Sequence, residues 1–444
     1  MTQKNPLVRT SLLLLPLQIV LRGGEALMPV LLAAWFGRSR DTDFAMLALA
    51  ASALVGSLVF QSFQDGSLVP IVLETKTHEP SRVARLRGAL VAYNAAIGAG
   101  LALLLLGGGL LAAALVDHGA SFALATRMLP LLALQLALLG QRTLQVTLLH
   151  TERRFYATPV ISFVGIVVNL TTVAWLHERW GVATIALGLA VGEACALGAA
   201  WIATHLVYPI EFHYSFERSA PLRKFWRLVS AEVGGSAITR VNPLADQLVA
   251  AFAGVAGGGT LLRYSNDVAT VPTSLLHATL LPVLVAHLSH VRHAGQRPSV
   301  RLFRKTVRRT LAWVVLLLCA ASVLLYAIRL PLLQLAFLRG AMDALGVQTM
   351  ADVLPYHLLG LPSFGVLLVL ARAHVSLQNS SILVRLGIFN ASCNLLLNAM
   401  LVGPLGLRGV ALATSITHTA VAVVFAWLLT RKLRELGRTL WVPA

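Results

Sequence analysis

Long apolar runs recur along the whole chain, and they constrain its fold more than any other feature. A run of about 20 apolar residues is long enough to cross the roughly 30 Å hydrocarbon core of a bilayer as a helix. Only 12% of the 444 residues are charged, and the mean hydropathy is +0.76. The sequence therefore predicts an all-α integral membrane protein.

We expect about twelve transmembrane helices, most of them joined by short loops. Their approximate ranges are residues 11–36, 44–73, 88–116, 122–149, 157–177, 181–207, 228–254, 259–290, 308–330, 350–372, 382–402 and 406–430.

The two halves of the chain resemble each other. The segment "GSLVPIVLE" (66–74) resembles "ATLLPVLVA" (278–286), and the two occupy the same place in each half. The repeat unit is then six helices, which predicts two six-helix bundles related by a parallel repeat. We place the N-terminal bundle at residues 1–215 and the C-terminal bundle at residues 216–444.

The net charge of +18 is distributed unevenly between the loops. By our count the termini and the even-numbered loops hold about 25 Lys and Arg, and the odd-numbered loops hold about 8, so the positive-inside rule predicts that both termini are cytoplasmic. The basic charge is thus a signal of topology, and we do not expect nucleic-acid binding.

Ionisable side chains within the apolar runs are the first candidates for a function. Arg22 and Glu25 are three residues apart in the first run, on one face of a helix. A bare charge at the centre of a membrane helix costs about 2.5 to 3.5 kcal/mol on insertion scales. We therefore expect these residues to face a water-filled cavity, and an internal ion pair without a substrate role is the alternative.

The seventh and eighth predicted helices contain a second group of charges. Arg240 and Asp246 interrupt the seventh, and Pro243 between them is expected to kink it. Broken helices near a repeat interface are typical of transporter sites. Arg263 and Asp267 are four residues apart at the start of the eighth, where the membrane surface is an equally good location.

The eleventh and twelfth predicted helices offer neutral oxygen atoms. Asn390, Asn394 and Asn398 share one face of a helix by their four-residue spacing, and Thr414 follows in the next helix. Hard cations such as Na⁺ prefer oxygen ligands of this kind, although hydrogen bonding between helices is the other interpretation. The sequence contains no Walker A, HExxH or GxSxG motif, so we do not expect an enzyme.

Several segments share their order and spacing with one family of membrane proteins. They include "AAWFGRSRDTDFAMLALA" (33–50), "FQDGSLVPIVLE" (63–74) and "NLLLNAMLVGPLGLRGVALATS" (394–415). On these segments the chain is identified as a shortened and divergent member of the MurJ/MviN-type lipid II flippases, within the multidrug/oligosaccharidyl-lipid/polysaccharide exporter superfamily.

The resemblance implies a V-shaped pair of bundles around a central cationic cavity. It also implies a flippase that moves a lipid-linked sugar precursor across the bacterial cytoplasmic membrane by alternating access. Arg22, Asp43 and Asp65 fall on acidic or basic positions of the family. The predicted substrate-binding residues are Arg22, Glu25, Asp43, Asp65, Arg240, Arg263 and Asp267.

Some members of this family bind Na⁺ between the seventh, eleventh and twelfth helices. The matching positions here are Asp246, Asn394, Asn398, Val410 through its carbonyl, and Thr414. Either Na⁺ or H⁺ is then the expected coupling ion, and no other cofactor is expected. Asn398 replaces a carboxylate of the family pattern, which weakens the expectation of an ion site.

Other departures concern the substrate. Met28 and Pro29 stand where the family has an Arg-Asp pair, and the family usually has two further C-terminal helices. A pyrophosphate needs several cationic donors, so another lipid-linked glycan is an alternative to lipid II.

Two other functions remain open from the sequence. They are a cation-coupled exporter of drugs or small molecules and a non-transporting membrane scaffold. The expected partners are a lipid-linked oligosaccharide and the bilayer, with the protein acting as a monomer.

Overall fold

The structure is a computed structural model, and its described part is helical, without a strand. It describes residues 23–24, 27–60, 68–116, 119–152, 154–208, 216, 219–226, 229, 241–293, 300–377 and 381–439. The chain divides into two compact units, Met1–Val233 and Gly234–Ala444.

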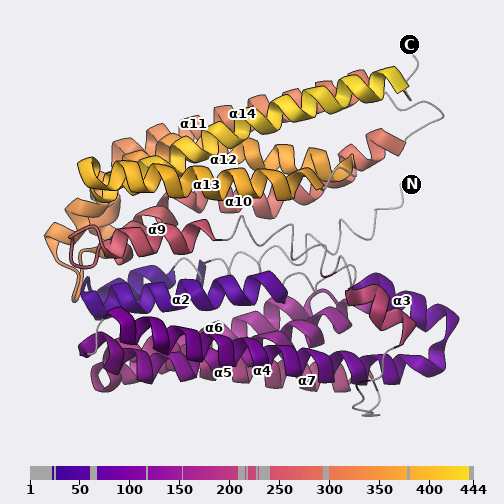
Figure 1. The fold of residues 1–444 in the computed structure, drawn as a ribbon, viewed down its shortest axis with the longest axis horizontal. Coiled ribbons are helices and arrows are strands. Elements are labelled where there is room, and N and C mark those ends of the chain that lie inside the picture. Colours follow the sequence, from indigo (N-terminus) through magenta and orange to yellow (C-terminus); the bar gives the residue numbers. More distant parts are fainter. Residues whose placement is uncertain are drawn as a thin grey trace, which may run out of the picture. The chain divides into compact units, whose positions relative to one another are not determined.

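The first unit begins, in its described part, with a short apolar helix at Leu27–Phe36. Its longer helices lie side by side in Figure 1. They are α2 (Arg40–Val59), α3 (Leu68–His78), α4 (Val83–Val116), α5 (Ala120–Thr151), α6 (Ala157–Trp180) and α7 (Thr184–His205), with 3-10 turns η2 (Pro80–Arg82) and η3 (Gly181–Ala183) before α4 and α7.

The described part of the second unit contains one short helix and five long ones, which Figure 1 labels. They are α9 (Asn242–Ala251), α10 (Gly258–His293), α11 (Val300–Phe337), α12 (Ala344–Ser376), α13 (Ser381–Leu405) and α14 (Leu407–Thr439).

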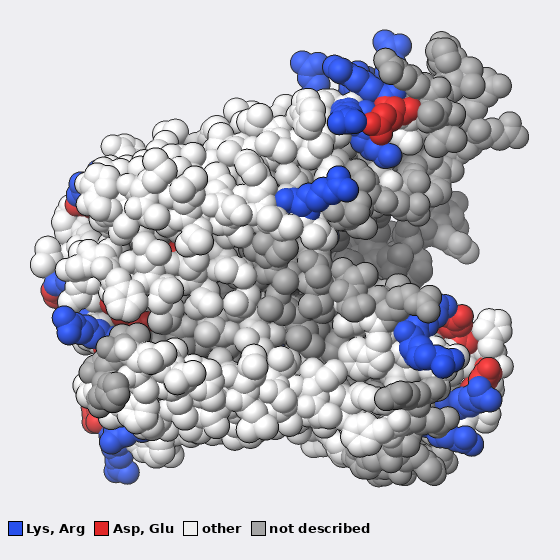
Figure 2. All heavy atoms as spheres, viewed as in Figure 1, with Lys and Arg blue, Asp and Glu red and all other residues white. Residues whose placement is uncertain are grey.

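Seven helical stretches in the described part are long and apolar enough to cross a membrane, and one of them, Ala157–His205, contains both α6 and α7. Large apolar side chains are exposed on the flanks, among them Leu104 at 66%, Trp175 at 84% and Leu324 at 59%. Figure 2 shows white flanks, with Lys and Arg gathered toward the ends of the helices. Exposed apolar area of this extent fits lipid rather than water. The prediction of an all-α membrane protein is confirmed.

Two predicted spans differ from the helices observed. The span predicted at 44–73 overlaps α2, which ends at Val59, and α3, whose described part begins at Leu68, and residues 61–67 lie outside the described part. The helix α9 begins at Asn242, within the span predicted at 228–254, and Pro243 lies in its first turn. A proline costs little there, because the first N–H groups of a helix have no partner within the helix. Residues 230–240 lie outside the described part of the chain, so the kink expected at Pro243 stays a prediction.

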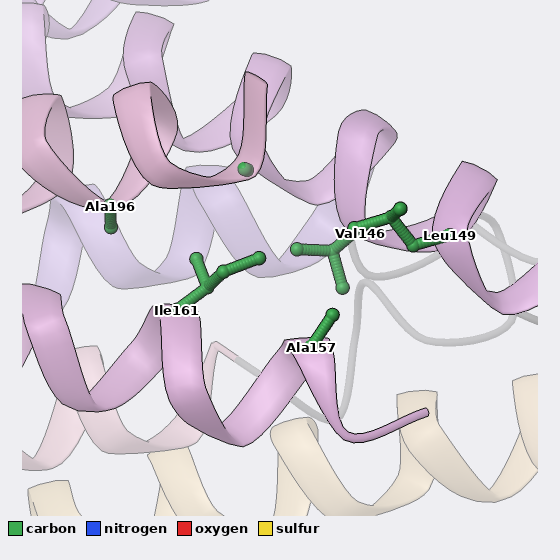
Figure 3. Close-up of a cluster of buried hydrophobic side chains, with 6 residues drawn as sticks. Val146, Leu149, Ala157, Ile161 and Ala196 are labelled. Atoms are coloured by element: carbon green, nitrogen blue, oxygen red, sulfur yellow. The ribbon is translucent and has the colours of Figure 1, made fainter. Parts of the chain in front are cut away.

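The first unit is held together by small residues between α5, α6 and α7. Figure 3 shows Val146 and Leu149 of α5 pointing toward Ala157 and Ile161 of α6. Farther along the α6–α7 contact the backbones come close, since a Cβ atom on Gly192 would lie 2.5 Å from the carbonyl oxygen of Gly165. Contacts of this kind are typical of membrane helices, which associate by close packing.

The second unit has a comparable core in which α9 and α10 meet α12 and α14. Its buried members are Ala250, Leu262, Val353, Leu407, Val410 and Ala411. The contact between α12 and α14 is tight, because a Cβ atom on Gly360 would lie 2.5 Å from the hydroxyl of Ser415. This core holds the short helix α9 against α14, and Asp246 lies on α9.

Candidate functional site

Four polar side chains from three helices meet inside the second unit. Asp246 lies in α9, Asn394 and Asn398 lie one turn apart in α13, and Thr414 lies in α14. Both asparagines are fully buried. The four-residue spacing puts them on one face of α13, which turns toward α9 and α14.

The hydrogen bonds converge on the carboxylate of Asp246. Asn398 Nδ2 donates to Asp246 Oδ1 over 2.6 Å, and Thr414 Oγ1 donates to Asp246 Oδ2 over 2.9 Å. The second N–H of Asn398 reaches Asn394 Oδ1 at 3.1 Å, and Asn394 Nδ2 lies 3.4 Å from Thr414 Oγ1. We refer to these four side chains, with the carbonyl of Val410, as the Asp246 cluster.

The Asp246 cluster contains a carboxylate but no positive charge. Its donors are two neutral groups, and no Lys, Arg or His of the described residues forms an ion pair with Asp246. A carboxylate taken out of water needs a counter-charge or a proton, because hydrogen bonds from neutral groups replace only part of its hydration. The arrangement therefore favours uptake of a cation or a proton.

The chemistry of the donors suits a hard cation. The carbonyl oxygen of Val410 lies 3.2 Å from Thr414 Oγ1, and Asn398 Oδ1 is buried without a hydrogen-bond partner. Carboxylate, amide, hydroxyl and backbone oxygens are the ligands that hard cations prefer. The described residues contain no group of three or more His, Cys, Asp or Glu that could hold a metal, so a soft-metal site is not indicated in this part of the chain.

The other described candidates lie in different places. Arg263 Nε and Asp267 Oδ1, both on α10, are 3.3 Å apart, as their four-residue spacing suggests, and both side chains are partly exposed. Asp43 lies in the first turn of α2 and is buried. That helix begins with a capping box between Ser39 and Thr42, and an acidic residue in the first turn interacts favourably with the helix dipole. The position of Asp43 thus also fits a structural role at the start of α2, in addition to the predicted role in substrate binding.

Four predicted site residues lie outside the described part of the chain. They are Arg22, Glu25, Asp65 and Arg240.

The sequence did not reveal one buried ion pair of the first unit. Arg142 of α5 pairs with Glu193 of α7, and the two side chains are 19% and 12% exposed. Each residue stood out as a charge within a predicted span. The signal that could have joined them is their opposite charge in spans of the same bundle.

Comparison with known proteins places the chain in one family. The profile described as "Lipid II flippase MurJ" matches residues 32–442. A curated relative from Synechocystis sp., named "Probable lipid II flippase MurJ", is 24% identical over 206 residues, which is 46% of this chain and 38% of the relative. The chain spans about two fifths of the length of the curated relatives it matches.

Solved structures show the same fold. "Lipid II flippase MurJ, inward closed conformation" superposes with a TM-score of 0.78 at 16% identity, covering 94% of this chain and 87% of the other. An inward-facing MATE family multidrug resistance transporter of the MOP superfamily gives 0.74 at 13% identity, covering 94% and 95%. Because the family profile matches nearly the whole chain, this protein is a multi-pass membrane protein that belongs to the lipid II flippase MurJ family.

Proposed function

We propose that this protein moves a lipid-linked sugar precursor, similar to lipid II, across the bacterial cytoplasmic membrane by alternating access. The observation that supports it most is the family match over residues 32–442. In this proposal the two units are the bundles that rock around the substrate, both termini are cytoplasmic, and the protein works as a monomer without catalysing a reaction.

We further propose that the Asp246 cluster couples this movement to Na⁺ or H⁺. A bound cation would supply the positive charge that the cluster lacks. The side chains of the Asp246 cluster and the carbonyl of Val410 would supply the oxygen ligands of this cation. Asn398 can turn its amide so that Oδ1, which has no partner, replaces Nδ2 beside Asp246, and the two ends of an amide differ little in shape. The cluster joins α9 to α13 and α14, so its occupancy can change how these helices pack.

The substrate proposal rests on cationic groups that meet an anionic head group. Arg263 is 40% exposed and pairs with Asp267 through Nε, and guanidinium groups bind phosphate oxygens in a bidentate way. Arg22 and Arg240 are the further candidates. Met28 and Pro29 replace charged residues of the family pattern, so a lipid-linked glycan with fewer phosphate contacts than lipid II is also a substrate to test.

Reconstitution tests the proposal. The protein is placed in proteoliposomes with fluorescent lipid II, or with another undecaprenyl-linked glycan, and movement between leaflets is followed with and without Na⁺ and a pH gradient. We expect movement that depends on one of the two ions and is lost in Asp246→Asn.

Asp352→Asn is the matched control, because Asp352 lies in the same unit but pairs with Arg408 at 2.6 Å, with both side chains partly exposed. Lipid movement that depends on neither Na⁺ nor a pH gradient would contradict the coupling. An equal loss of movement in Asp246→Asn and Asp352→Asn would contradict it too. Absence of movement for every lipid tested would contradict the flippase and favour the scaffold.

The second candidate is a cation-coupled exporter of small molecules. The loss of charge at Met28 and Pro29 favours it, because small organic molecules do not need the several cationic donors of a pyrophosphate site. In the same proteoliposomes, uptake of a fluorescent cationic dye that depends on Asp246, together with no movement of lipid, would select this function.

A further inference from the structure

A small groove lies at the polar end of the first unit. It is bordered by α3, by η2 and the start of α4, and by the helical segment 220–226. The residues that line it include Thr75, Arg82, Arg85, Leu86, Ala89 and Ser219. Figure 2 shows Lys and Arg side chains around the end of this unit where Figure 1 places α3. None of these residues belongs to the sites described above.

The groove has a positive charge that no described carboxylate balances. Glu74 and Glu79 lie in or beside the bordering segments, Glu152 at the end of α5 contacts α3, and each of these three glutamates is already in an ion pair. The pairs are Glu74 with Lys224 at 2.6 Å, Glu79 with Arg82 at 2.7 Å and Glu152 with Lys76 at 2.7 Å. Arg85 is exposed and forms no ion pair within the described residues. An anion in the groove would therefore meet the guanidinium of Arg85, which has no ion-pair partner among the described residues, and that of Arg82, which already pairs with Glu79.

The inner wall of the groove is apolar. Leu86 and Ala89 are buried, and Pro221 also lines the groove. No charged residue follows Arg87 until the end of α4 at Val116. The groove thus lies at the boundary between the charged start of α4 and its apolar stretch, which is the depth of lipid head groups in a bilayer. A free phosphate would not use the apolar wall, whereas the glycerol part of a phospholipid would lie against it.

We propose that this groove binds the phosphate of an anionic phospholipid head group, with Arg85 as its principal ligand. Arg82 and Arg85 are three residues apart at the start of a helix and reach the same side. Guanidinium groups bind phosphate oxygens in a bidentate way. The hydroxyl of Ser219 in the lining is a third possible donor. This site is distinct from the Asp246 cluster and holds a lipid of the surrounding membrane, not the transported one.

The test is a titration of the detergent-purified full chain with phosphatidylglycerol, followed by native mass spectrometry. We expect one lipid to bind more tightly than the rest, and Arg85→Ala to weaken it roughly fivefold, as loss of one cation near an anionic surface does. Glu79→Gln frees Arg82 from its ion pair and should tighten binding. Arg223→Ala is the control, because Arg223 is exposed in the bordering segment but does not line the groove.

Three results would overturn the proposal. They are wild-type affinity in Arg85→Ala, an equal loss in Arg223→Ala, and displacement of the lipid by inorganic phosphate at the same concentration. The last of these would identify a free-phosphate site. Because Arg85 is exposed, we expect the variant to unfold at the wild-type temperature, and Arg85→Lys should keep part of the affinity by keeping the charge.

Discussion

In the first unit the carboxylate of Glu193 faces the guanidinium of Arg142, and both side chains are mostly buried. In the second unit the carboxylate of Asp246 faces two neutral donors, the amide of Asn398 and the hydroxyl of Thr414. Among the described residues, the carboxylate of Glu193 therefore has a counter-charge and that of Asp246 does not. A buried pair with fixed partners ties α5 to α7, whereas a carboxylate without a cation needs an ion from solution to become neutral.

The difference suggests a division of tasks between the units. The Arg142–Glu193 pair is expected to stay formed throughout a transport cycle and to hold α5 against α7. The Asp246 cluster is expected to change its charge during a transport cycle. Substitutions at the two places should therefore alter stability in opposite directions, and the following predictions test that contrast.

The largest effect is expected from Arg142→Met. The substitution leaves Glu193 buried without its partner, which should lower the free energy of unfolding by about 3 to 5 kcal/mol. Denaturant unfolding in mixed micelles measures it. The double variant Arg142→Met/Glu193→Met should regain most of the loss. Equal stability of the single and double variants would mean that the ion pair does not stabilise the contact between α5 and α7.

Asp246→Asn should abolish transport while making the protein slightly more stable. The amide removes a buried charge and can still accept the hydrogen bond from Thr414, so we expect the free energy of unfolding without Na⁺ to rise by about 1 kcal/mol. The same micelle assay measures this change, and the proteoliposome assay measures transport. A clear loss of stability would show that Asp246 already has a counter-charge and would remove the contrast between the units.

Asn398→Asp should make the Asp246 cluster depend more strongly on a bound cation. It places a second carboxylate where Asn398 Nδ2 now lies 2.6 Å from Asp246 Oδ1. Two neighbouring carboxylates cannot both stay ionised without a cation, so Na⁺ affinity should rise about tenfold. Titration of the unfolding temperature with Na⁺ measures the change. Unaltered affinity would place the cation elsewhere.

The smallest effect is expected at a partly exposed pair of the first unit. Burial would raise the pKa of Glu152, but hydrogen bonds from Lys76 and Tyr208, both 2.7 Å long, hold the pKa below its ordinary value of 4.5. A lowered pKa in the folded state means that this stabilisation is complete above pH 4.5 and is lost as the pH falls through the lowered value.

Glu152→Gln should therefore cost less than about 1 kcal/mol at neutral pH, as expected of an exposed ion pair. The difference from wild type should shrink as the pH falls below 4.5, through the lowered pKa of Glu152. Chemical unfolding at a series of pH values checks it. A difference in the free energy of unfolding that grows as the pH falls would contradict the lowered pKa of Glu152.

Some of these features could be predicted from the sequence. Hydropathy revealed the membrane helices, since a bilayer requires long apolar runs wherever the chain crosses it. The four-residue spacing of Asn394 and Asn398 indicated a shared face, and the structure shows the two in contact. Arg263 and Asp267 were likewise close by helix geometry alone. These are local relations along one helix, and local relations can be read from spacing.

Other features depend on which helices are neighbours. Arg142 and Glu193 are 51 residues apart, and nothing in their spacing shows that α5 packs against α7. The end of α2 at Val59 and the start of α9 at Asn242 were missed because apolar residues lie on both sides of each position. The groove beside Arg85 was missed because the chain segments that form it are far apart in the sequence.

Thermal unfolding of the purified protein tests most directly whether Asp246 needs a cation. The unfolding temperature is measured against Na⁺ at constant ionic strength and, separately, against pH in choline chloride. We expect the wild type to gain stability with Na⁺ at alkaline pH or with protons when Na⁺ is absent, and Asp246→Asn to respond to neither. A wild type indifferent to both ions, or a variant that responds equally, would contradict the account.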